Sequence, residues 1–109
     1  MPASEFALPI SAQSSKFKAS HPKNVGAYPM FDRAHGANAR SRATQMLNSG
    51  WLTVREAQTI YNRTSDRWGF EYKKLVHSDR TGKWKSVQAE SKPRLRAAAN
   101  RHSPYNLDW

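Results

Sequence analysis

A proline-free stretch in the middle of this chain constrains its fold more than any other feature. All six prolines lie outside residues 37–90, and three of the four tryptophans lie inside them. Because proline breaks helices and central strands, regular structure is expected where it is absent. We therefore expect one domain over residues 37–90, an extended basic, proline-containing arm over residues 1–36, and a basic tail over residues 91–109 with a short helix between Pro93 and Pro104.

Length and charge limit both the size of the protein and its partner. The chain has 109 residues, 38% of them hydrophobic, which suffices for one small core. A net charge of +10 favours a polyanionic partner, first nucleic acid and less often an anionic membrane or an acidic protein surface. The sequence has neither a signal-peptide pattern nor an apolar run long enough to cross a bilayer. We expect a cytoplasmic protein of a bacterial or phage-infected cell.

The first part of the domain has the pattern of a short amphipathic helix. Ala39, Ala43, Met46 and Leu47 recur at spacings that place them on one helix face. Glycine at position 50 supplies a stop signal. The pattern predicts a helix from about residue 36 to 48.

A second helix has the clearest start in the sequence. Thr53-Val54-Arg55-Glu56 matches a capping box, in which the threonine hydroxyl and the glutamate carboxylate bind each other's backbone N–H groups. The box predicts a helix of about eight residues that ends near Asn62.

A third helix and a hairpin are expected after it. Thr64, Ser65 or Asp66 can cap a helix over about residues 65–76, because Trp68, Tyr72, Leu75 and Val76 recur on one helix face. The turn residues 79–82 then separate residues 76–78 from residues 83–87, which predicts a β-hairpin.

This order of helices, turn and hairpin resembles the winged helix-turn-helix family over about residues 37–88. The residues that carry the resemblance are Trp51 to Ala57, Ser65 to Leu75 and the hairpin around Gly82. It implies a mainly α fold with a small β-hairpin, in which a compact three-helix core carries extended N- and C-terminal arms. It also implies that the third helix enters the major groove of DNA.

On that reading, the exposed side of the third helix and its flanks binds DNA. These residues are Arg63, Ser65, Arg67, Glu71, Lys73 and Lys74. Arg67 is the first choice for reading a base, because arginine makes bidentate contacts to guanine. The alternative is an ordinary solvated helix face with intrahelical ion pairs.

The hairpin and the tail supply further basic residues. We expect Arg80, Lys83 and Lys85 to contact phosphates or the minor groove, as wing residues do in the family, and Arg94 and Arg96 to contact phosphates without reading sequence. Trp84, between two lysines, either stacks on a base or sugar or covers a small core.

Apolar residues in the two arms leave a second function open. Phe6, Leu8 and Phe17 at the front and Tyr105 and Trp109 at the back either pack on the domain or anchor another protein. The alternative function is an interaction protein that docks on a host enzyme or a nucleoprotein assembly, as an inhibitor or a minor structural component. RNA binding cannot be separated from DNA binding by the sequence.

Catalytic chemistry has little support. The chain lacks cysteine and its four histidines are scattered, so we expect no metal and no cofactor. Asp66 with Glu71 and Lys73 resembles a nuclease pattern, but that chemistry requires a strand where a helix is predicted. We expect a small DNA-binding protein without enzymatic activity, a transcriptional regulator or a phage accessory factor.

Overall fold

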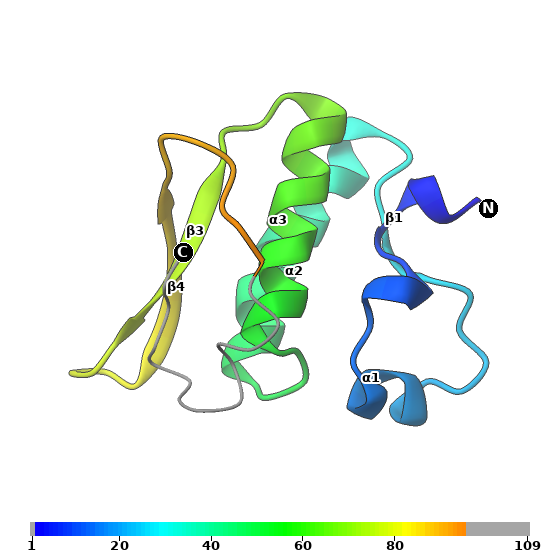
Figure 1. The fold of residues 1–109 in the computed structure, drawn as a ribbon, viewed down its shortest axis with the longest axis horizontal. Coiled ribbons are helices and arrows are strands. Elements are labelled where there is room, and N and C mark those ends of the chain that lie inside the picture. Colours follow the sequence, from blue (N-terminus) through cyan, green and yellow to red (C-terminus); the bar gives the residue numbers. More distant parts are fainter. Residues whose placement is uncertain (1, 96–109) are drawn as a thin grey trace.

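One long helix, α3 (Val54–Trp68), runs through the middle of the molecule, and the other elements surround it (Figure 1). The computed structural model describes residues 2–95. Helix α2 (Arg33–Asn48) packs along α3, and the hairpin of β3 (Lys73–Ser78) and β4 (Lys83–Gln88) covers a second side. The N-terminal segment covers a third side. The fold is a compact globule of three helices and two antiparallel two-stranded sheets.

The capping box is confirmed, and it has an additional role in the fold. The Thr53 hydroxyl accepts from the N–H of Glu56 at 3.0 Å, and the Glu56 carboxylate accepts from the N–H of Thr53 at 2.8 Å. The second oxygen of the same carboxylate accepts from the N–H of Ser14 at 2.8 Å. Glu56 thus starts α3 and also fastens the N-terminal segment to it.

The prediction of separate second and third helices is wrong. Helix α3 continues to Trp68, and the region expected to form a third helix contains the linker to β3 and most of that strand. Thr64 does not cap a new helix, because its hydroxyl donates back to the Ile60 carbonyl at 2.8 Å inside α3. The helix ends at Gly69, which adopts the left-handed conformation with φ of 75°.

Helix α2 confirms the first predicted helix with an earlier start. It begins at Arg33, because the Asp32 carboxylate accepts from the N–H of His35 at 2.7 Å and caps the first turn. Three of the four residues predicted to face inward are buried, and Met46 packs against the core that they join.

The N-terminal segment is folded, which corrects the prediction of an extended arm. Strand β1 (Phe6–Leu8) pairs with β2 (Ala27–Pro29), and the short helix α1 (Ser15–Ser20) lies between them in sequence. Phe6, Leu8 and Phe17 are buried, with exposed fractions of 6%, 0% and 6%. Of the two alternatives for these side chains, packing on the domain is the one observed. The elements are too short to show a sequence period, so the pattern could not reveal them.

The predicted hairpin is confirmed and is longer than expected. Its strands pair from Lys73 with Gln88 to Ser78 with Lys83, and residues 79–82 form the connecting turn. Gly82 in that turn is left-handed, with φ of 70°.

Glycine at position 26 allows the N-terminal segment to close. A Cβ atom there would lie 2.4 Å from the Phe6 ring. We expect Gly26→Ala to lower the free energy of unfolding by about 1–3 kcal/mol, because the buried ring would have to move. Urea denaturation of the full chain measures this. Gly50→Ala is the control, since Gly50 also has positive φ but has no neighbour within 4 Å of the added Cβ. An equal loss of stability in both variants would show that backbone strain, not crowding against Phe6, destabilises the fold.

Some predictions lie outside the described residues. These are the short tail helix, for the part beyond Leu95, together with Arg96, Tyr105 and Trp109. In residues 2–95, no helix combines the length and the apolar character that crossing a membrane requires.

Candidate nucleic-acid interface

The outward side of the β3–β4 hairpin carries a cluster of lysines. Successive residues of a strand face opposite sides, so the paired register divides the hairpin into two faces. Leu75, which is fully buried, marks the inner face. The opposite face, which we call the ribbon face, consists of Lys74, Val76, Ser78, Lys83, Lys85 and Val87.

The ribbon face is basic and accessible. Lys74, Lys83 and Lys85 are all exposed, and none of the six residues of the face is acidic. Arg80 adds a fourth exposed cation in the turn, next to the exposed Asp79. The side chains of Lys83 and Lys85 leave the strand about 7 Å apart, the rise of two strand residues.

The free edge of β3 fixes the hairpin to α3. The side chain of Gln58, fully buried on α3, donates to the Lys73 carbonyl at 2.7 Å and accepts from the N–H of Leu75 at 3.2 Å. It therefore pairs with the backbone of β3 as a neighbouring strand would. On a strand anchored in this way, the backbone positions from which the lysines extend are fixed.

A second anchor joins β4 to the end of α2. The Asn48 side chain donates to the Trp84 carbonyl at 3.0 Å and accepts from the N–H of Trp84 at 2.8 Å. The Trp84 ring packs against the core and meets the ring of His77 edge-on at 4.9 Å. Of the two alternatives for Trp84, the core cover is the one observed.

The residues predicted to share one reading face are dispersed over the fold. Arg63 donates to the carbonyls of Phe6 and Ala3 at 3.1 and 3.3 Å, and Arg67 pairs with Glu5 at 2.8 Å. Both arginines hold the N-terminal segment against α3. Ser65 is only 4% exposed and faces the interior. Base contacts by Arg63, Ser65 and Arg67 stay a prediction. The two arginines already have partners on the same chain, and Ser65 is buried.

Downstream, the predicted residues separate between the two faces of the hairpin. Glu71 lies in the linker before β3, and Lys73 lies on the inner face. Lys74 joins the ribbon face, and it lines an open hollow of about 530 Å³ together with the exposed Arg94. The structure therefore places Lys74, Lys83 and Lys85 on one face of the hairpin, with Arg80 in the turn at one end and Arg94 beside Lys74 at the other.

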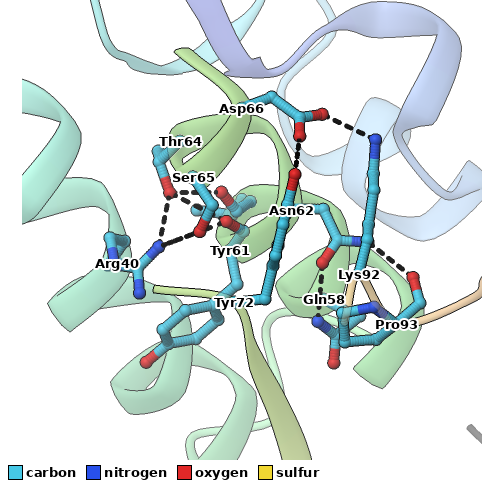
Figure 2. A network of polar contacts seen from close by, with 11 residues as sticks. Arg40, Gln58, Tyr61, Asn62, Thr64, Ser65, Asp66, Tyr72, Lys92 and Pro93 are labelled. Carbon is cyan, nitrogen blue, oxygen red and sulfur yellow. Dashed lines mark hydrogen bonds and ion pairs between the residues drawn. The ribbon is translucent and has the colours of Figure 1, made fainter. Parts of the chain in front are cut away.

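A buried arginine holds the end of α3, and sequence reasoning missed it (Figure 2). The guanidinium of Arg40 donates to the carbonyls of Tyr61 and Glu71 and to the hydroxyls of Thr64 and Ser65, at 2.6–3.2 Å. Burial lowers the pKa of Arg40, which stays protonated at neutral pH. The signal for it was present, because Arg40 lies on the same helix stripe as Ala43 and Leu47.

A second polar cluster holds the chain after β4 against α3 (Figure 2). Asp66 accepts from Lys92 and from the Tyr72 hydroxyl, both at 2.6 Å, and Asn62 donates to the Pro93 carbonyl at 2.9 Å. Partial burial opposes ionisation of Asp66, but the hydrogen bonds from Lys92 and Tyr72, together with the charges of Lys92 and Arg63, lower the pKa of the carboxyl group. The hydrogen bond that the Tyr72 hydroxyl donates to Asp66 raises the pKa of Tyr72.

Replacing Arg67 tests whether this residue reads a base. We expect Arg67→Ala to leave the affinity for duplex DNA within about twofold of the parent, and to lower the free energy of unfolding by about 0.2–1 kcal/mol, because its partner is Glu5 on the same chain. Fluorescence anisotropy and urea denaturation give the two values. A loss of affinity confined to one DNA sequence would instead restore Arg67 as a base-reading residue.

The chain was compared with known protein families, curated proteins and solved structures. No family model, curated protein or solved structure matches the chain. Within residues 2–95, no group of three or more histidine, aspartate or glutamate side chains is placed to hold a metal ion.

Proposed function

We propose that this protein binds double-stranded DNA without catalysis, through the ribbon face. The observation that carries the proposal is the fixed two-stranded ribbon with Lys74, Lys83 and Lys85 exposed on its outer side. The major groove of DNA admits a two-stranded β-ribbon as well as a helix. The net charge of +10 supports the same class of partner.

The helices are less suited to this contact. Ten of the fifteen residues of α3 are buried, so the helix that follows the turn after α2 is enclosed by its neighbours. In the winged helix-turn-helix arrangement the residues expected to enter the groove are 65–76, and here these form the end of α3, the linker and most of β3. We propose that here the hairpin, at the position of the wing, makes the main contact.

Lysine contacts to phosphate position a protein on DNA and carry no sequence information by themselves. The proposed contact therefore suits a small accessory factor or regulator that holds DNA with modest sequence preference. Ser78 and the two valines of the ribbon face are the residues available for contacts to base edges.

Titration of labelled duplex DNA at several salt concentrations tests this function. If the four hairpin cations each neutralise one phosphate, the logarithm of the association constant falls with the logarithm of salt concentration with a slope of about −3.6. Absence of binding at low salt would contradict the proposal.

Duplex RNA separates the two nucleic acids. The major groove of A-form RNA is deep and narrow, and protein side chains do not read it. We therefore propose that DNA is preferred. We expect the affinity for duplex RNA of the same sequence to be lower by about tenfold or more. Equal affinities for duplex DNA and duplex RNA would show that the protein contacts only the sugar–phosphate backbone of the nucleic acid.

The alternative function, an interaction protein that docks on a host enzyme or a nucleoprotein assembly, has less support because some of its proposed anchor residues are buried. Phe6, Leu8 and Phe17, proposed as anchors for a partner, are in the core. Among the described residues, the exposed large apolar side chains are instead Ile10, Val25, Phe31 and Trp51.

A further inference from the structure

A second surface, away from the hairpin, has a different chemistry. An open hollow of about 400 Å³ lies between the α1–β2 segment and the second half of α2. Four of its nine lining residues carry aromatic rings, and we call it the aromatic hollow. Its principal lining residues are Phe17, His21, Tyr28, Arg42, Met46 and Trp51. Its size falls within the range of pockets that bind small ligands.

The rings of the hollow are only partly used by the core. Trp51 is 50% exposed although it directly precedes the buried Leu52. A backbone hydrogen bond from its N–H to the Met46 carbonyl, at 3.0 Å, fixes the turn that carries it. His21 stacks on Phe17 with ring centres 4.4 Å apart. The hollow therefore has the half-exposed Trp51 ring on a turn held by a backbone hydrogen bond, together with the stacked rings of His21 and Phe17.

Tyr28 has an unusual backbone conformation at this site. Its φ of 58° lies in the left-handed region, which aromatic residues rarely adopt. The neighbouring pairs hold it there, since Ala27 pairs with Leu8 and the N–H of Met30 donates to the Glu5 carbonyl at 2.8 Å. Strain of this kind collects at functional sites.

The hollow is also cationic. Arg42 is exposed at its wall, and none of the described residues that line the hollow is acidic. Arg42 and Tyr28 also line an adjoining hollow of about 220 Å³ that reaches His35 and Asn38. Burial raises the pKa of Tyr28 while the charge of Arg42 opposes this, which is consistent with the two side chains lying close together.

We propose that the aromatic hollow binds an unpaired nucleobase of a single-stranded nucleic-acid segment, with the base stacked on Trp51 and the adjoining phosphate on Arg42. Stacking on aromatic side chains combined with basic residues is the general means of binding single strands. The occupant must be flat and negatively charged to match both features of the wall. The inference rests on nucleic acid being the partner, as proposed above, but it uses a different surface from the ribbon face.

Two oligonucleotides of equal charge test the inference on the full chain. One is a labelled hexamer of thymidine nucleotides, and the other is the same backbone without bases. We expect the abasic hexamer to bind about tenfold more weakly, because it has nothing to stack. Trp51→Ala should weaken binding of the thymidine hexamer by about tenfold and leave the abasic hexamer unchanged. Trp51→Phe, which keeps a ring, should retain most of the affinity.

Ile10→Ala is the matched control, because it removes another exposed apolar side chain that does not line the hollow. It should leave both affinities unchanged. Equal binding of the two hexamers by the parent protein, or an equal loss on both in Trp51→Ala, would overturn the inference.

DNA binding by the ribbon face and base binding by the hollow can be contradicted independently of each other. Trp51→Ala should not change the affinity for duplex DNA, whereas replacing Lys83 and Lys85 should lower it and keep the preference for the hexamer with bases. A base preference without duplex binding would retain the hollow and reject the ribbon face. Duplex binding without base preference would reject the hollow alone.

Discussion

Replacing both Lys83 and Lys85 with glutamine lowers the affinity for duplex DNA by about 10- to 60-fold at 0.1 M salt. Both side chains are exposed on the ribbon face, so the variant removes two cations without disturbing the buried side of the hairpin. If each lysine neutralises one phosphate, the slope of the salt dependence also becomes shallower by about 1.8. Anisotropy titrations of one duplex at four salt concentrations measure both changes.

The control for this variant has the same change in net charge at the other end of the molecule. Lys18 and Lys23 are exposed in and after α1, which lies opposite the hairpin (Figure 1). Their replacement by glutamine should lower the affinity by less than about threefold, through the long-range field alone. Equal losses in the two variants would show that total charge, not the ribbon face, determines binding.

Arg40→Ala should lower the free energy of unfolding by about 2–4 kcal/mol. The guanidinium is buried and donates four hydrogen bonds that join α2 to the end of α3 and to the linker before β3 (Figure 2). It also lies over the Phe70 and Tyr61 rings, 4.9 Å from each centre. Truncation leaves polar groups without their donor and opens a cavity. Urea denaturation followed by far-UV circular dichroism gives the value.

Two further variants isolate the cause of that loss. Arg42→Ala removes an exposed arginine from the same helix and should cost less than about 0.5 kcal/mol. Arg40→Lys keeps the charge but lacks the planar fork of donors, so it should not restore the stability of the parent. A loss below about 1 kcal/mol for Arg40→Ala would mean that the network contributes little.

Local signals in the sequence predicted the elements that local contacts determine. The capping box at Thr53 and the turn before Gly82 involve residues within a few positions of each other, and both are confirmed. The end of α3 combines a local signal, the left-handed Gly69, with a distant contact from Arg40 to Ser65, 25 positions away. The spacing of Trp68, Tyr72 and Leu75 also fits a helix, so period alone could not show that Leu75 belongs to a strand.

The N-terminal segment was mispredicted for a similar reason. Its contacts to α3 span 57 and 60 positions, from Arg63 to the carbonyls of Phe6 and Ala3. Backbone carbonyls carry no sequence signal, so an arginine that binds them looks the same as one that faces solvent. The prediction of Arg63 as a DNA contact follows from that ambiguity, whereas Arg67 pairs with the Glu5 side chain, 62 positions away.

The candidate surfaces differ in how far the sequence predicted them. The basic hairpin residues were recognised from their turn and charge, and their role as DNA contacts stays a prediction. The aromatic hollow was not recognised, because Tyr28, Arg42 and Trp51 come from three segments that show no common pattern. Only the fold places them around one space.

Amide chemical-shift mapping of the labelled full chain, titrated with a short DNA duplex, tests the role of the ribbon face most directly. The largest shifts should fall on residues 74–87, and above all on Lys74, Lys83 and Lys85, while α1 and the start of α2 change little. Shifts concentrated on α1 or α2, with the hairpin unaffected, would contradict DNA binding by the ribbon face.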